Sequence, residues 1–159
     1  MKKVFALALA LVMALSFAAC SPSIGMPNPF VTYGSTQEAS KAVGFDVVVP
    51  NTVEGYTKGR IIQGVSSSSL SMIQVLDEAA DGNTLCIRKA RGTGDISGDS
   101  NTYSISKKVT VGARSVTLKG NGNDQFKVAI WTKDNYTYAV VATAGLSEEA
   151  MIKIIQQVL

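Results

Sequence analysis

Hydrophobic and polar residues alternate with a period of two through most of the chain after residue 58. Short polar or glycine-containing segments separate the alternating stretches. This period predicts β-strands with one face on a core, since successive side chains of a strand point to opposite faces. The predicted strands lie near 59–64, 70–77, 84–90, 105–111, 114–119, 126–132 and 136–143.

The connections between these stretches predict antiparallel pairing. Asp81-Gly82-Asn83 is a turn sequence, and Gly112-Ala113 fits a two-residue type II′ hairpin with glycine at the position of positive φ. Trp131–Tyr136 crosses from one predicted strand to the next through Asp134-Asn135. Consecutive hairpins of this kind favour an antiparallel meander over a parallel sheet.

Two helices flank the predicted strands. Ser35-Thr36-Gln37-Glu38 is a capping-box sequence, and Gly44 suits the end of the helix that follows. A further short strand is predicted at 45–49, before Pro50. Near the C-terminus, Ser147 is a favourable N-cap, and the apolar residues after it lie on one helical stripe: Met151, Ile154, Ile155 and Val158. The predicted fold is α+β, an antiparallel meander of about six or seven strands packed against a short N-terminal helix and a C-terminal helix.

The first 19 residues are typical of a secretory signal peptide. Lys2 and Lys3 precede an uncharged apolar run over 4–15, and Ala18 and Ala19 supply the small residues near a cleavage site. The apolar run is shorter than the roughly 20 residues that a transmembrane helix needs. We therefore expect a signal peptide at 1–19.

Phe17-Ala18-Ala19-Cys20 resembles a bacterial lipobox, in which lipid is attached to the cysteine and cleavage occurs just before it. The lipobox prefers Leu where this chain has Phe17. The alternative is a plain signal peptide with a coincidental cysteine. The resemblance implies an acylated Cys20 on the extracytoplasmic side of a membrane of the bacterial cell envelope. We then expect a flexible proline-containing tether at 20–34 and a single α+β domain at 35–159.

Charge and composition exclude several classes of partner and chemistry. Without Lys2 and Lys3, 13 basic residues stand against 12 acidic ones, with no basic run, so no nucleic acid is expected. The chain has no histidine, which excludes catalysis by Ser-His-Asp and Cys-His sets and removes the usual zinc ligands. A Ser-Lys dyad stays formally open, but no serine lies in a nucleophile-elbow sequence. We expect no enzyme activity, no metal and no cofactor.

Two polar features have alternative interpretations. Residues 95–101 carry spaced oxygen ligands like those of a calcium loop, but they depart from the EF-hand pattern and carry few negative charges. We favour a loop whose Asp and Asn side chains form turns. Cys86 is either a functional cysteine, as a reactive thiol or in an intermolecular disulfide, or a buried small apolar residue. We favour burial, which is the usual state of a free cysteine.

The aromatic residues give the one candidate for a ligand-contacting surface. Trp131, Tyr136 and Tyr138 lie on neighbouring predicted strands, where aromatic side chains could stack on a ligand. The alternative is ordinary packing of the sheet. Trp131 shares its strand face with Lys127 and Ala129, a mixture of charged, small and aromatic groups.

The order of features from Ala39 to Leu159 is similar to a bacterial family of extracytoplasmic domains with no assigned function. The similarity rests on short segments: Ala42-Val43-Gly44-Phe45 with Val49-Pro50, Gly55-Tyr56, Val109–Gly112 with Val116–Leu118, Trp131 with Tyr138, and Leu146–Glu149. It implies a fold and a location but no catalytic residue. We expect a lipid-anchored, non-enzymatic module that binds or senses an unknown envelope protein or ligand. The alternative is a carrier of lipid or another apolar ligand in a cavity between sheet and helices.

Overall fold

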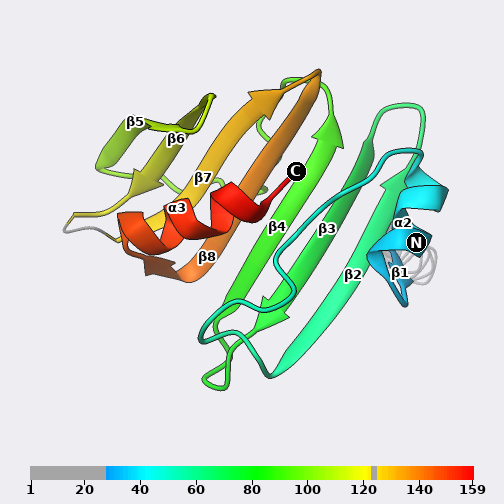
Figure 1. Cartoon of the computed structure of the whole chain (residues 1–159), viewed down its shortest axis with the longest axis horizontal. Coiled ribbons are helices and arrows are strands. Elements are labelled where there is room, and N and C mark those ends of the chain that lie inside the picture. Colours follow the sequence, from blue (N-terminus) through cyan, green and yellow to red (C-terminus); the bar gives the residue numbers. More distant parts are fainter. Residues whose placement is uncertain (1–27, 123–124) are drawn as a thin grey trace, which may run out of the picture.

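The computed structural model describes residues 28–122 and 125–159. It contains one antiparallel sheet of eight strands in the order β1-β2-β3-β4-β8-β7-β6-β5 (Figure 1). The strands are β1 Val31–Tyr33, β2 Gly59–Ser66, β3 Ser71–Glu78, β4 Thr84–Arg91, β5 Ile105–Val111, β6 Arg114–Gly120, β7 Phe126–Lys133 and β8 Tyr136–Leu146. The α+β class and the antiparallel pairing are therefore as predicted.

The predicted strand count of six or seven is wrong, because the sheet has eight strands and the sequence did not predict β1. Val31–Tyr33 pairs with Gly64, Gln63 and Ile62 of β2 and forms one edge of the sheet. Three residues are too few to show a period of two, so no pattern in the sequence signals this strand. It lies within the stretch where the sequence predicts a tether.

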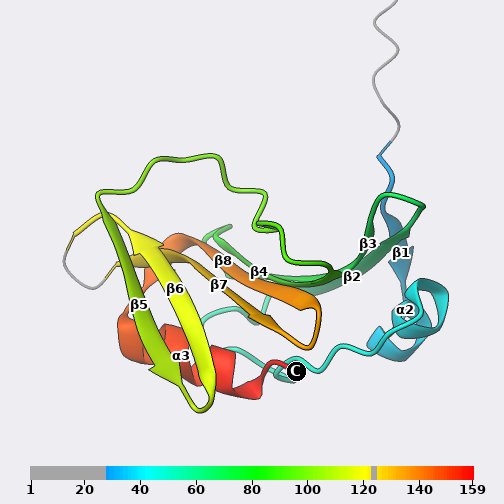
Figure 2. The ribbon, with the colours of Figure 1, turned by 90° about the horizontal axis from the view of Figure 1, so that it is seen from above.

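The strands form two runs of hairpins rather than one continuous meander. The chain builds β1 to β4 in order, crosses to the far edge of the sheet at β5, and returns through β6 and β7 to β8, which pairs with β4. The crossing is made by residues 92–104, which we call the strap. Figure 2 shows the strap on one face of the sheet and both helices on the other. We call these the strap face and the helix face.

The helix ends follow the predicted capping chemistry. Helix α2 (Thr36–Val43) begins after Ser35, whose Oγ accepts a hydrogen bond from the Glu38 N–H at 3.2 Å, and it ends at Gly44 with φ of 84°. Glu38 reaches back one residue beyond the cap, where its carboxylate accepts from the Gly34 N–H. Helix α3 (Glu148–Gln157) is capped by Ser147, which accepts from the Ala150 N–H.

The strand predicted at 45–49 is absent. This segment crosses the helix face, where Phe45 and Val47 are buried together with α2 and Ile73 of β3. Its one reciprocal backbone contact joins Val48 and Leu159, each donating an N–H to the carbonyl of the other. The alternation of apolar residues over 45–49 therefore arises because one side of an extended segment is buried, and the segment does not pair with the sheet.

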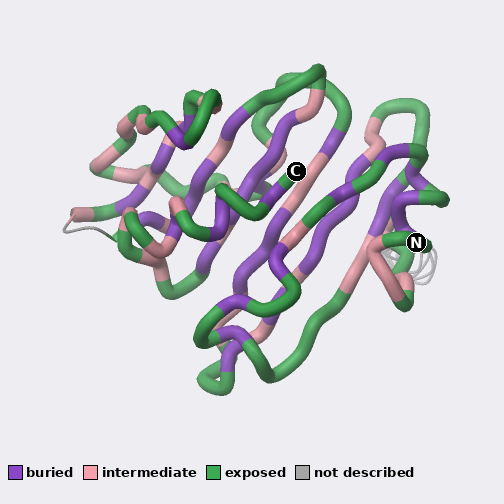
Figure 3. The backbone as a smooth tube through the Cα atoms, in the orientation of Figure 1, coloured by how far each residue is buried: buried purple, intermediate pink, exposed green. Residues whose placement is uncertain are grey.

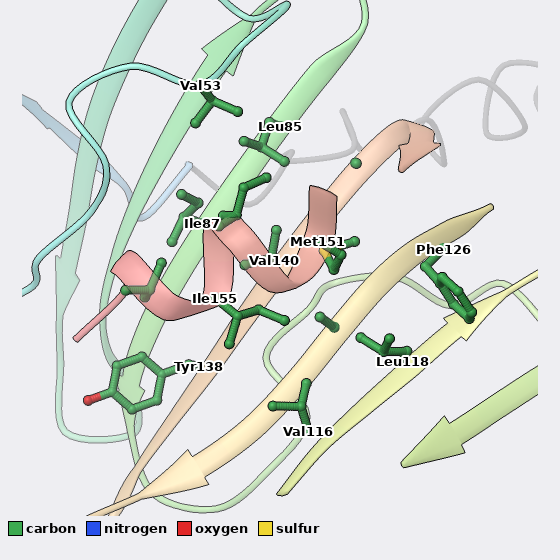
Figure 4. Packing of buried hydrophobic residues seen from close by; sticks show 14 of the residues in the cluster. Val53, Leu85, Ile87, Val116, Leu118, Phe126, Tyr138, Val140, Met151 and Ile155 are labelled. Carbon is green, nitrogen blue, oxygen red and sulfur yellow. The ribbon is translucent and has the colours of Figure 1, made fainter. Parts of the chain in front are cut away.

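The largest apolar cluster lies between α3 and the sheet. Met151, Ile155 and Val158 are fully buried and pack with residues of β4 and β6 to β8, as the predicted stripe requires. Figure 4 shows Met151 and Ile155 of α3 among these strand residues. In Figure 3 most of the length of the central strands is buried, with half-buried residues between, and most turn residues are exposed. Full burial of each such side chain stabilises the fold by about 1.5–3 kcal/mol.

Candidate functional site

Strands β6 and β7 separate from each other at one end of the sheet. The last residue pair between β6 and β7 is Thr117 with Ile130. Beyond this pair, β6 stays paired with β5 as far as Arg114, and β7 stays paired with β8 as far as Lys133. The tips of the two hairpins consequently diverge, as Figure 1 shows for β5–β6 and β7–β8. We call the space between these tips the fork.

Each tip is a tight two-residue turn. Gly112 has φ of 61° and Ala113 has no positive φ, which confirms the predicted type II′ hairpin. Asp134 and Asn135 have φ of 51° and 62°, the two positive values of a type I′ turn. Because both turns are short, the strand residues beside them are held at the very ends of their hairpins.

The fork encloses a hollow of about 450 Å³. Its polar lining comprises two cations, two hydroxyls and one amide, and no carboxylate. The lining residues are Val111, Gly112, Ala113, Arg114, Ser115, Thr132, Lys133 and Gln156, from β5, β6, β7 and the last turn of α3. A surface hollow of this size can hold a small-molecule group.

The two cations of the fork are held differently. The Arg114 guanidinium donates to the carbonyls of Ile155 and Val158 at 2.7 and 3.0 Å, at the C-terminal end of α3, where positive charge is favourable. Lys133 has a side chain 48% exposed, and its Nζ lies 3.7 Å from the exposed carboxylate of Asp134. Arg114 is therefore a fixed positive charge, and Lys133 is free to turn toward a ligand.

The structure brings Trp131, Tyr136 and Tyr138 together beside the fork but buries two of them. Trp131 and Tyr138 are 2% and 4% exposed, and their rings stack with centroids 5.2 Å apart and planes within 3°. Both belong to the cluster beneath α3. Tyr136 is half-buried against Phe45 and lines a second hollow of about 440 Å³. These positions fit the packing interpretation for Trp131 and Tyr138 and leave Tyr136 at the surface.

Two further cations from β4 lie over these aromatic rings. The Lys89 Nζ lies 4.8 Å from the ring centroid of Tyr136 and 5.1 Å from that of Tyr138, and it donates to the Asp46 carbonyl at 2.7 Å. Burial lowers the pKa of this ammonium. Arg91 lies over the Phe45 ring and donates to the Gly44 carbonyl. A cation therefore already occupies one face of each of these rings.

This end of the sheet has an excess of positive charge. Among residues 28–122 and 125–159, no carboxylate lies within ion-pair distance of Lys89, Arg91 or Arg114. The three side chains donate to main-chain carbonyls instead. Asp46 and Asp134 interact with Lys89 from beyond ion-pair distance, so its charge is compensated only in part. Elsewhere, cations such as Arg60 and Lys107 pair directly with acids.

The loop over 95–101 forms part of the strap and uses its carboxylates internally. Asp95 accepts hydrogen bonds from the Ser97 N–H and Oγ and pairs with Lys119. Asp99 accepts from the Asn101 N–H and the Tyr103 hydroxyl. These bonds confirm the turn interpretation. In the described part of the chain, no three acidic or cysteine side chains gather as a metal site would require.

Arg88 fastens the strap to the sheet. Its guanidinium donates to Gln74 Oε1 at 3.0 Å, to the Ile96 carbonyl at 3.0 Å and to the Ser97 carbonyl. Cys86 is buried on the same face, which confirms the expectation of a buried cysteine, and burial raises the pKa of its thiol.

The signal peptide, the lipobox and Cys20 lie outside the described residues. Within those residues, no helix has the length and apolar character needed to cross a bilayer.

Comparison with known families identifies the domain. A family profile, Domain of unknown function (DUF4367), matches residues 47–158, which is most of the chain. The chain belongs to the DUF4367 family. Searches of curated proteins and of solved structures each found no significant match. The DUF4367 match spans β2 to α3, and so includes the fork, the strap and the cluster beneath α3.

Proposed function

We propose that this DUF4367 protein is a lipid-anchored extracytoplasmic lipoprotein whose domain is a non-enzymatic recognition module. The observation that carries the proposal is a filled interior beside a surface hollow whose lining includes charged and hydroxyl side chains. Side chains of α3 lie directly on the sheet, and the fork presents charged and hydroxyl groups outward. A domain built in this way recognises ligands with its surface.

The alternative, a carrier of lipid or another apolar ligand, receives less support. A carrier needs a continuous apolar space between sheet and helix, and here that space holds Trp131, Tyr138, Met151 and Ile155, each at most 4% exposed. Interiors packed in this way leave few voids larger than a water molecule. The carrier hypothesis would require α3 to leave the sheet.

The anchoring is supported by the leader, with Lys2 and Lys3, the apolar run over 4–15 and the lipobox-like sequence ending in Cys20. Stable attachment takes more than one acyl chain, which an acylated lipoprotein cysteine supplies.

The test is expression of the full chain in a bacterium that makes lipoproteins. We expect the protein in the membrane fraction, with an acylated N-terminal peptide beginning at Cys20. Cys20→Ala should release it from membranes without changing its circular dichroism spectrum. Cys86→Ala is the matched control and should stay membrane-bound. Recovery of the wild-type chain in the soluble fraction would contradict the anchor, and a turnover abolished by one substitution would contradict the non-enzymatic role.

A further inference from the structure

We propose that the fork binds the oxyanion group of a ligand, a phosphate or a carboxylate, with Lys133 and Arg114 supplying the charge. This deepens the proposed recognition role and rests on it. Four polar side chains of the hollow can donate hydrogen bonds beside the cation of Lys133, namely those of Arg114, Ser115, Thr132 and Gln156.

The charge of the fork selects against other ligand classes. A bound cation would need acidic ligands, and no carboxylate lines the hollow. Apolar atoms also form part of the lining, so they would contact the organic part of a ligand and not its charged group. Lys89 and Arg91, both without an acid at ion-pair distance, add positive potential at the same end of the sheet. An anion is the complement of this surface.

The two cations of the fork differ in mobility: Arg114 is held rigidly, and Lys133 can reorient. Arg114 is pinned to the end of α3, so its position is set before a ligand arrives, which reduces the entropic cost of binding. Lys133 has a half-exposed side chain and a long contact to Asp134 that it can exchange for a ligand. Ser115 and Thr132 are exposed hydroxyl residues on the two arms of the fork.

The size of the hollow indicates a single charged group with a small organic remainder. A volume of about 450 Å³ exceeds what an inorganic phosphate fills and lies within the range of small-molecule sites. The fork is also open at the surface between the hairpin tips, so a longer ligand could present its charged group from outside.

The experiment is calorimetric titration of the full-length protein, purified in detergent, with inorganic phosphate, glycerol 3-phosphate and galacturonate. We expect saturable one-site binding of at least one probe that weakens as salt rises. Tighter binding of glycerol 3-phosphate would identify a phosphate ligand, and tighter binding of galacturonate a carboxylate ligand. Lys133→Gln should weaken binding at least tenfold without altering the fold, since this side chain is half exposed.

The matched control is Lys108→Gln. It removes the same charge from an exposed position of β5 outside the fork, and should change affinity less than twofold. Absence of saturable binding to all three probes, or equal weakening by the two variants, would overturn the proposal. Cross-linking in cell envelopes distinguishes failure of the oxyanion proposal from failure of the recognition role. If no probe binds but Lys133→Gln abolishes cross-linking to an envelope protein, only the oxyanion proposal is refuted. If no probe binds and no envelope protein is cross-linked, both proposals are refuted.

Discussion

Gly98 shows how one residue controls the attachment of the strap. It has φ of 65°, in the left-handed region, and a Cβ at this position would collide with Arg88 Nη1. Arg88 cannot withdraw without losing its bonds to the carbonyls of Ile96 and Ser97. The residue therefore has to be glycine for both backbone and packing reasons.

We predict that Gly98→Ala lowers the free energy of unfolding by about 1–3 kcal/mol, the usual cost of forcing a side chain into this conformation. Gly94→Ala is the control, because Gly94 is also in the strap, has no positive φ, and has no neighbouring atom within 4 Å of where a Cβ would lie. Urea unfolding of both variants measures the difference. Equal stability of the two variants would show that Arg88 and Gly98 do not constrain the strap.

Residue-level patterns predicted the helix ends well. Ser35, Gly44 and Ser147 have roles that depend on local backbone geometry, and local geometry is what short sequence motifs specify. The burial of Trp131 is harder to predict, since alternation assigns the side chain to a face of the sheet but does not indicate whether a helix covers that face. Trp131 is buried because α3 packs on that face.

At the level of elements, the strap is the feature that joins the two halves of the sheet. Asp99 and Tyr103 close its second half, with the phenol donating to the carboxylate at 2.6 Å. Burial and this hydrogen bond together raise the pKa of Tyr103 to about 12. The unfolded phenol titrates near 10. Because the folded value is higher, the contribution to stability is complete below pH 10 and is lost as the pH rises toward 12.

We predict that the wild-type protein loses more stability than Tyr103→Phe between pH 8.5 and pH 11. The variant has no phenol to ionise at this position, so its stability should fall less steeply with pH. The measurement is urea unfolding of both proteins at the two pH values. Tyr33→Phe on β1, far along the chain from the strap, should follow the wild type, and parallel behaviour of all three proteins would refute the role of Tyr103.

The fork could not be predicted from the sequence, although its parts could. The Gly112-Ala113 turn and the end of β7 near Lys133 were both indicated by local patterns. The separation of β6 from β7 depends on where their ladder stops, at Thr117 and Ile130. Alternation fixes which face a side chain takes but carries no information about where two strands part. Strand order was equally hidden, because the strap carries the chain past β8 to β5.

At the scale of the whole molecule, the buried residues that stabilise the fold lie on the two faces of the sheet, and the exposed cations lie at one end. The helix face holds the core beneath α3, the strap face holds Arg88 and Cys86, and one end of the sheet carries Arg114 and Lys133 of the fork. Figures 1 and 2 show the two faces and the diverging hairpin tips. Residues 20–159 carry 13 basic and 12 acidic side chains, so this concentration of cations is local and not general. In the proposed recognition role, the domain would bind its ligand at this end of the sheet.

The central claim is that the domain recognises ligands with its surface and carries no cargo inside. Native mass spectrometry of residues 21–159, compared with the denatured mass of the same protein, tests it most directly. We predict equal masses once weakly bound ions are removed, because the space beneath α3 is filled by the side chains of Met151, Ile155 and Val158. A discrete co-purifying adduct in the mass range of a lipid would contradict the claim and establish the domain as a carrier.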